Sequence, residues 1–78
     1  MLPAHQSRAA RALLGWSQTD LANASRVSIS TIRDYETEKR VPIPNNLAAI
    51  RAALEAAGIQ FVEPGIDPQG SGVVLRKA

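Results

Sequence analysis

The segment of residues 17–40, SQTDLANASRVSISTIRDYETEKR, constrains the fold of this chain more than any other feature. It contains two serines, Ser17 and Ser28, each placed to cap the N-terminus of a short helix. Asp20 stands three residues after Ser17, which predicts a variant capping box. The spacing leaves room for one helix that ends near Ser25 and a tight turn before the next. The segment therefore predicts two short helices joined by a tight turn.

The apolar residues of this segment form a seam between the two helices. Leu21 and Ala22 face inward from the first helix, and Val27 carries the turn into the core. Ile32 and Tyr35, three residues apart, form the buried edge of the second helix. This arrangement is typical of a helix-turn-helix, a motif whose second helix lies in the DNA major groove.

An Ala- and Arg-rich segment precedes this motif and predicts a first helix from about Pro3 to Leu14. Proline suits the first turn of a helix, because its missing N–H would be unpaired there anyway. Gly15 ends the helix, since glycine adopts left-handed backbone angles without strain. Trp16 is expected to pack beneath the turn as part of the core. The side chains expected to face the core at helical spacing are Ala9, Ala10, Leu13 and Leu14.

A proline-rich break follows the two short helices. In Val41-Pro42-Ile43-Pro44 each proline pushes the preceding residue away from helical angles, so this stretch is predicted to be extended. A fourth helix then starts at Asn45 or Asn46, with Gly58 as its C-terminal cap. Its predicted buried stripe, at spacings of three and four residues, is Leu47, Ile50, Leu54 and Ala57.

The period of the pattern changes after residue 58. Residues 59–62 and 73–76 are predicted to form short strands, with the loop 64–72 between them. Two strands alone are marginally stable in water, so they need a surface to cover or further strands to pair with. We therefore divide the chain into a domain of residues 1–58 and a β tail of residues 59–78 that joins a partner's tail in a homodimer. The alternative is a hairpin folded onto its own fourth helix. The tail residues expected at the dimer interface are Ile59, Phe61, Val73, Val74 and Leu75.

Composition narrows the function further. The chain of 78 residues is long enough for one folding unit, and 45% apolar residues favour a folded core. Nine Lys and Arg against seven Asp and Glu give a net charge of +2, which permits DNA binding without demanding it. A single histidine and no cysteine leave no metal cluster, and the acidic residues lack a base partner, so we expect neither catalysis nor a metal or cofactor. Neither a signal peptide nor a membrane span is predicted, which makes the cytoplasm the expected location.

The outward face of the predicted third helix carries side chains suited to reading bases. At about 100° per residue, Ile29, Ser30, Arg33 and Thr37 lie on the side opposite the apolar seam. Isoleucine can pack on a thymine methyl group, arginine can fork onto guanine, and serine accepts either kind of base. Two alternatives remain open: Ile29 belongs to the core, and Arg33 is an ordinary solvated arginine.

Phosphate contacts are expected from four residues. Gln18 and Ser28 sit at helix N-termini, where backbone amides and the helix dipole favour anions. Lys39 and Arg40 follow the third helix and could clamp phosphates, which fixes the register of a protein on DNA. The alternative for these two is a solvated loop. Asp34 counts against tight binding unless it meets a cytosine amine, because a carboxylate is repelled by phosphates.

Three stretches together resemble a known family: ARALLGWSQTDLA, VSISTIRDYE and RVPIPNNLAAIRAALEAAGIQF. They look like the phage-repressor type of helix-turn-helix, the Cro/Xre-like family, from about residue 7 to residue 62. They are especially similar to small bacterial transcriptional regulators, which commonly end in a Gly-rich loop and a basic strand such as GSGVVLRK. The resemblance implies a mainly α, four-helix repressor-like domain with a short C-terminal β-hairpin or β tail.

The resemblance also implies roles for individual residues. It places Gln18 against the DNA backbone and pairs Arg11 with Glu36 in an internal ion pair between the first and third helices. The start and outer face of the recognition helix are Ser28, Ile29, Ser30 and Arg33. Arg26 departs from the family pattern, because the turn usually carries glycine there. Either Arg26 adopts a strained left-handed conformation, or the turn differs.

These observations lead us to expect a regulator of transcription that binds the major groove of double-stranded DNA. A homodimer would place two recognition helices about 34 Å apart on a near-palindromic operator. Repression by blocking promoter access is the expected mode. The alternative is a protein-interaction module, or an antitoxin, that binds a partner through the C-terminal β tail.

Overall fold

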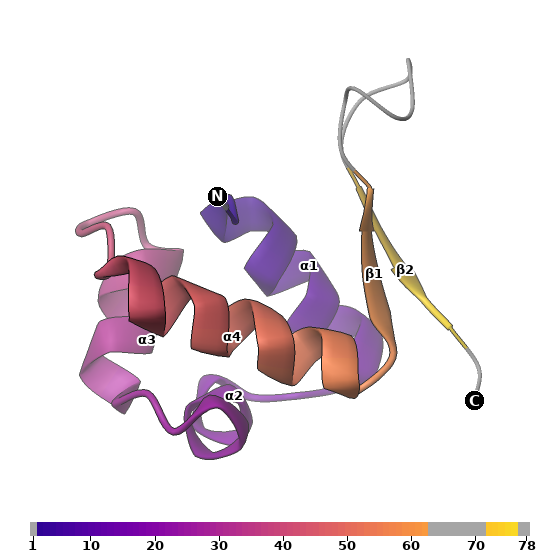
Figure 1. The fold of residues 1–78 in the computed structure, drawn as a ribbon, viewed down its shortest axis with the longest axis horizontal. Coiled ribbons are helices and arrows are strands. Elements are labelled where there is room, and N and C mark those ends of the chain that lie inside the picture. Colours follow the sequence, from indigo (N-terminus) through magenta and orange to yellow (C-terminus); the bar gives the residue numbers. More distant parts are fainter. Residues whose placement is uncertain (1, 63–71, 77–78) are drawn as a thin grey trace.

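The computed structural model describes residues 2–62 and 72–76, and these ranges form four helices followed by a two-stranded antiparallel hairpin (Figure 1). The fold is mainly α, as the sequence predicts. The helices are α1 (Ala4–Leu14), α2 (Gln18–Ser25), α3 (Ile29–Glu36) and α4 (Pro44–Ala56), and the strands are β1 (Ile59–Val62) and β2 (Gly72–Leu75).

Three predicted caps are present: Gly15 at the end of α1, Ser17 at the start of α2 and Ser28 at the start of α3. Pro3 is the N-cap of α1, and Gly15 ends that helix with a left-handed φ of 69°. Ser17 Oγ accepts from the Asp20 amide at 3.0 Å, while Asp20 Oδ2 accepts from the Ser17 amide at 2.9 Å. This reciprocal pair is the predicted capping box. At the start of α3, Ser28 Oγ accepts from the Thr31 amide at 3.3 Å.

The fourth helix begins earlier than the sequence predicts. Its first residue is Pro44, with Ile43 as an extended N-cap at ψ 151°, so the predicted start at Asn45 or Asn46 is wrong by one or two residues. The physical reason is that proline costs nothing at the first helical position, where an N–H has no partner within the helix. At the other end Ala57 is the C-cap instead of the predicted Gly58, which follows one residue later with a left-handed φ of 108°.

The core lies where the helices cross. Leu21, Ile32, Ile50 and Leu54 are fully buried there. The predicted inward face of α1 is partly wrong. Ala10 is fully buried, but Ala9 is exposed and 46% of Leu13 is accessible, because the buried face of α1 is turned toward Gln6 and Ser7 instead. The predicted core residue Trp16 is half-buried and packs against the edge of the core.

The two strands pair in antiparallel register, with Ile59 opposite Leu75 and Phe61 opposite Val73. Ile59 and Phe61 are buried in the same hydrophobic core as the helices. The strand predicted for residues 73–76 lies one residue earlier, at 72–75. Of the predicted loop 64–72, residues 64–71 fall outside the described ranges.

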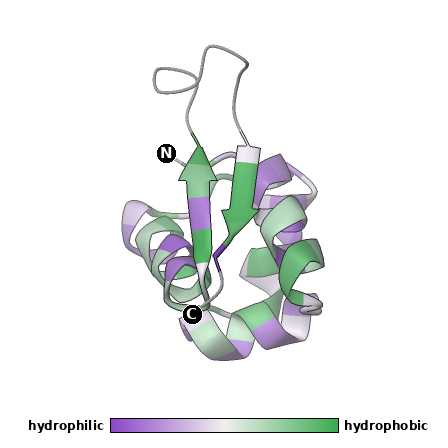
Figure 2. Cartoon of the chain, turned by 90° about the vertical axis from the view of Figure 1, so that its right-hand side faces the viewer, coloured by the Kyte–Doolittle hydropathy of each residue, from purple (hydrophilic) through white to green (hydrophobic). Residues whose placement is uncertain are grey.

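The hairpin covers α1 and α4, and Figure 2 looks onto its outer face, where β2 is hydrophobic along most of its length. Gln6 of α1 ties the two strands to the helices. Its Nε2 donates to the carbonyls of Val62 and Gly72, at 3.2 and 3.0 Å. The hairpin thus packs on its own chain, and it lies at the opposite end of the 33 Å long axis from α3 (Figure 1).

Candidate nucleic-acid interface

The turn between α2 and α3 determines how the second helix leaves the first. Arg26 caps α2 with φ 59° and ψ 30°, so the left-handed alternative is the one this chain adopts. A non-glycine residue in that region carries strain. The residue before it, Ser25, forms hydrogen bonds on both sides of this turn. Ser25 Oγ donates to the carbonyl of Leu21 at 2.7 Å and accepts from the Val27 amide at 3.3 Å.

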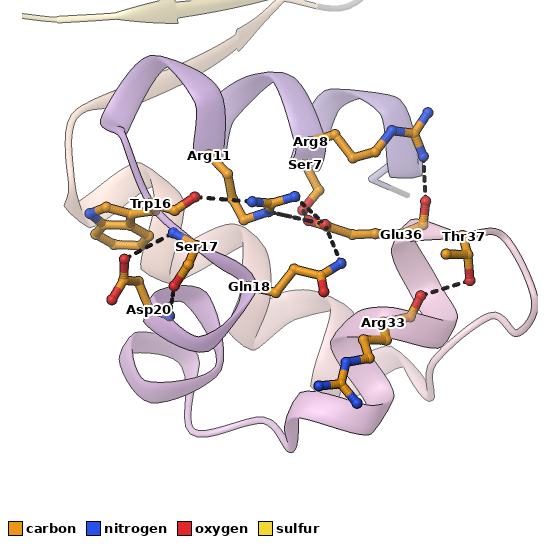
Figure 3. A network of polar contacts seen from close by, with 10 residues as sticks. All are labelled: Ser7, Arg8, Arg11, Trp16, Ser17, Gln18, Asp20, Arg33, Glu36 and Thr37. Carbon is orange, nitrogen blue, oxygen red and sulfur yellow. Dashed lines mark hydrogen bonds and ion pairs between the residues drawn. The ribbon is translucent and has the colours of Figure 1, made fainter.

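The outer face of α3 presents Ser30, Arg33 and Thr37 to solvent. Arg33 has no side-chain partner within residues 2–62 and 72–76, and Figure 3 shows it pointing away from the polar contacts of its own helix. Ile29 is neither fully exposed, as a base-reading side chain would be, nor fully buried in the core. It is half-buried and packs against the core. The strongest candidate for reading a base edge on this helix is therefore Arg33.

The hydroxyl groups of α3 are largely engaged by the helix itself. Ser28 Oγ lies 2.8 Å from Thr31 Oγ1 and 3.3 Å from Ser30 Oγ. Thr37 Oγ1 donates to the carbonyl of Arg33 at 2.8 Å. These bonds orient the hydroxyls, whose remaining lone pairs and exposed positions are still accessible to a ligand.

A buried carboxylate joins α3 to α1 and α2. Glu36 is 2% exposed, and it accepts hydrogen bonds from three side chains (Figure 3). Arg11 Nε lies 3.0 and 2.9 Å from its two oxygens, and Arg11 Nη2 lies 2.7 Å from Oε1. Ser7 Oγ donates to Oε2 at 2.7 Å, and Gln18 Nε2 donates to Oε1 at 3.2 Å. The structure thus brings together the two residues of the expected ion pair and adds two further donors.

The protonation state of Glu36 follows from these contacts. Burial by itself would raise the pKa of this carboxyl group, but the hydrogen bonds from Arg11, Ser7 and Gln18 outweigh it. The charge of Arg11 acts in the same direction, so the pKa of Glu36 lies below its ordinary value of 4.5. The side chain is therefore an anion at neutral pH. Burial raises the pKa of the neighbouring Tyr35 hydroxyl, and the charge of Glu36 adds to that rise.

Two residues of this network were not predicted from the sequence. Ser7 bonds the Glu36 side chain, and the Arg8 guanidinium donates to the Glu36 carbonyl at the end of α3. Helix α1 therefore holds the same residue by its side chain and by its main chain. One signal was present for Ser7: it lies four residues before Arg11, which puts both on one face of the helix.

These features match a known fold of DNA-binding domains. A Cro/C1-type helix-turn-helix family model matches residues 8–59. The chain belongs to this helix-turn-helix family. Comparison with curated proteins gave no match.

The helix-turn-helix domain carries its remaining candidate DNA contacts around the ends of α2 and α3. Gln18, the first residue of α2, is half-buried with its amide nitrogen on Glu36. Lys39 and Arg40 are exposed in the loop after α3, where both backbone amides donate to the Asp34 carbonyl, at 2.8 and 3.2 Å. Arg40 is only loosely paired, with 3.9 Å between its Nε and Asp34 Oδ2.

The residues expected at a dimer interface divide into two groups in the helix-turn-helix fold. Ile59 and Phe61 are buried within their own chain, and Val73 is half-buried. Val74 and Leu75 remain accessible, at 47% and 41%. An interface through the hairpin would therefore rest on Val74 and Leu75.

Metal-binding groups and membrane-spanning helices are both absent from the described part of the chain. Within the described ranges, no group of three or more His, Asp or Glu side chains is placed to hold a metal ion. None of the helices in those ranges has the length and apolar character needed to cross a bilayer.

Proposed function

We propose that this helix-turn-helix protein is a sequence-specific regulator of transcription that reads the major groove of double-stranded DNA through α3. The observation that carries the proposal is the Arg33 guanidinium, which lies on the exposed face of α3 and has no partner among the described residues. Arginine donates two parallel hydrogen bonds to O6 and N7 of guanine, and such a pair discriminates by about 1–3 kcal/mol against a wrong base.

The contacts around α3 favour this function, because reading a base requires a rigid helix. The Glu36 carboxylate at the end of α3 is bonded to α1 through Ser7 and Arg11 and to α2 through Gln18. Directional bonds of this kind hold the angle of α3 relative to the rest of the domain. A base-reading side chain then keeps its position when the domain docks.

Four residues are proposed to contact the DNA backbone on either side of α3. Ser28 lies at the N-terminus of α3, where amides favour phosphate. Gln18 uses one N–H on Glu36, so its second N–H is available to a phosphate. Lys39 and Arg40 supply positive charge beyond the other end of α3. Such contacts position the protein and leave sequence discrimination to α3.

The biological unit proposed is a homodimer in the cytoplasm that represses by occupying a near-palindromic operator within a promoter. Two-fold symmetry in the protein is matched by half-sites one helical turn apart, about 34 Å. Regulation is proposed to act through the level of the protein or through a partner protein.

Selection of bound duplexes from a random library, at near-physiological salt, tests the proposal. We expect an enriched, two-fold symmetric motif, with an affinity that falls by about tenfold or more in Arg33→Ala. The matched control is Arg76→Ala, which removes the same charge from the far end of the molecule and should weaken binding only slightly. No enriched motif, or an equal loss in both variants, would contradict sequence-specific reading through α3.

A second candidate function rests on the hairpin. Val74 and Leu75 are exposed on a strand pair whose outer edges could accept a further strand. The domain would then act as an interaction module, or as an antitoxin that binds both a toxin and DNA. Salt separates the two: DNA binding weakens with a slope of about −0.9 per neutralised phosphate, whereas strand addition is far less sensitive.

A further inference from the structure

The loop between α3 and α4 carries the most exposed large apolar side chains in the described ranges. Val41 is 73% accessible and Ile43 is 64% accessible, more than Val74 or Leu75 on the hairpin. A contiguous apolar patch left in water marks a surface used for binding, and these two side chains stand two residues apart in one loop. These two residues directly follow the recognition helix, so this loop is a candidate surface for binding a partner.

Two hollows lie beside this loop, and together we call them the α4 groove. The first, of about 400 Å³, opens between the start of α1, the end of α3 and the loop, and Val41 forms part of its rim. The second, of about 340 Å³, continues along α4 past Ala48. Leu2 and Leu47 line both, so the floor of the groove is apolar and continuous. A protruding apolar side chain thus stands next to an apolar recess.

We infer that the α4 groove is occupied by a second copy of this chain, with Val41 of each copy inserted into the groove of the other. A two-fold interface requires one surface to be complementary to itself, so that a knob and a hole lie side by side. The charges on the rim have the same property. Glu38 and Arg40 both line the first hollow, so Arg40 of one copy can face Glu38 of the other in both directions.

The position of this surface relative to α3 supports the same partner, and here the inference rests on the proposed function. The loop follows α3 directly, so a two-fold axis beside it keeps the two recognition helices close together. The hairpin lies at the other end of a 33 Å axis (Figure 1). Contact between two hairpins would place the recognition helices at the far ends of the pair, beyond the spacing of about 34 Å that adjacent major grooves require.

The test is the oligomeric state of the purified full chain, measured by sedimentation velocity from low micromolar to millimolar concentration, with and without the selected duplex. Val41→Glu places a charge on the knob, and Ala48→Arg places one in the groove. Val74→Glu is the matched control on the hairpin. All three positions are exposed, so each variant should melt as the parent does. We expect the first two variants to raise the dimer dissociation constant by about tenfold or more and Val74→Glu to leave it unchanged.

Charge exchange gives a second, independent readout. Glu38→Arg should weaken the dimer, and Glu38→Arg combined with Arg40→Glu should restore it, because opposite charges then face one another again. Both are measured without the duplex, because Arg40 is also proposed to contact DNA phosphate. A dimer dissociated by Val74→Glu but not by Val41→Glu would overturn the inference in favour of the hairpin. A parent that remains monomeric at all concentrations, alone and on DNA, would overturn it too. Failure of the proposed function gives a different result, because the parent would then not bind even a single half-site. If only the dimer inference fails or is disrupted, monomeric Val41→Glu should still bind a single half-site.

Discussion

The two ends of this molecule are held together by different physics. At the recognition end, a single buried carboxylate, Glu36, accepts from donors on two other helices. At the hairpin end, Ile59 and Phe61 pack into the core, and one amide, from Gln6, ties the strands down. Apolar burial stabilises the fold whatever the relative orientation of the groups, whereas a hydrogen bond stabilises it only within a narrow range of distance and angle. The comparison shows that the buried carboxylate lies where the angle between helices must be fixed.

The largest expected effect is the loss of the Glu36 carboxylate. Glu36→Ala leaves Arg11 and Ser7 without their acceptor, and removing one partner of a buried pair typically costs about 3–5 kcal/mol. Thermal and urea unfolding should therefore shift far below the parent. Under conditions in which Glu36→Ala is still folded, its affinity for the specific DNA site should also fall, because the angle of α3 is no longer held.

The control for that prediction is Glu38→Ala, two residues away in the exposed loop after α3. It removes the same charge and should change stability by no more than about 0.5 kcal/mol. Equal melting of Glu36→Ala and the parent would show that the carboxylate contributes nothing to holding the recognition end.

Acid should produce a graded version of the same loss. The pKa of Glu36 in the folded chain lies below the ordinary value of 4.5, so at low pH the unfolded chain binds the proton first. The stabilisation is complete above that value and disappears as pH falls through the folded pKa. Free energies of unfolding at several pH values between neutral and acid should fall for the parent. Glu36→Gln should show a smaller fall over the same range; identical pH profiles would contradict the assignment.

The hairpin end should respond less strongly. Gln6→Ala leaves the carbonyls of Val62 and Gly72 without their donor, which we expect to cost about 1–3 kcal/mol. Amide hydrogen exchange should rise in the hairpin first, while the affinity for DNA changes little. Gln60→Ala is the matched control, because that glutamine bonds Arg76 on the exposed face. Faster exchange in α3 than in the hairpin would contradict a separation between the two ends.

The smallest expected effect lies in the turn between α2 and α3. Arg26→Gly should stabilise the domain by up to about 1 kcal/mol, because glycine adopts the φ of 59° without the steric cost of a Cβ. Urea unfolding measures the gain, and Arg26→Asn, which also tolerates this region, should give part of it. A loss of stability in both would indicate that the arginine side chain contributes more than its backbone strain costs.

The parts of the fold that could be predicted from sequence are those set by neighbouring residues. Ser17, Asp20 and Gly15 act within one helical turn, so the ends of α1 and α2 follow from local chemistry. The start of α4 is harder to predict, because both prolines restrict the residue before them, but only Pro44 sits at the first position, where a helix tolerates a proline.

The candidate site divides along the same line. The exposed position of Arg33 follows from helical periodicity, but the half-buried position of Ile29 depends on how α3 rests on the core. The bonds of Arg8 and Gln6 span 28 to 66 residues of sequence, so they exist only once α1 has its final angle. No local sequence pattern specifies that angle, so the roles of these two residues cannot be predicted from the sequence.

Gln6 and Ser7 are consecutive residues of α1, and one bonds the hairpin while the other bonds Glu36. Each residue along a helix turns the next by about 100°, so deleting one residue between Ser7 and Arg11 would swing Arg11 off the carboxylate. We therefore expect related sequences to carry no insertion or deletion within α1. The length of this helix fixes the positions of the hairpin and of α3 relative to each other.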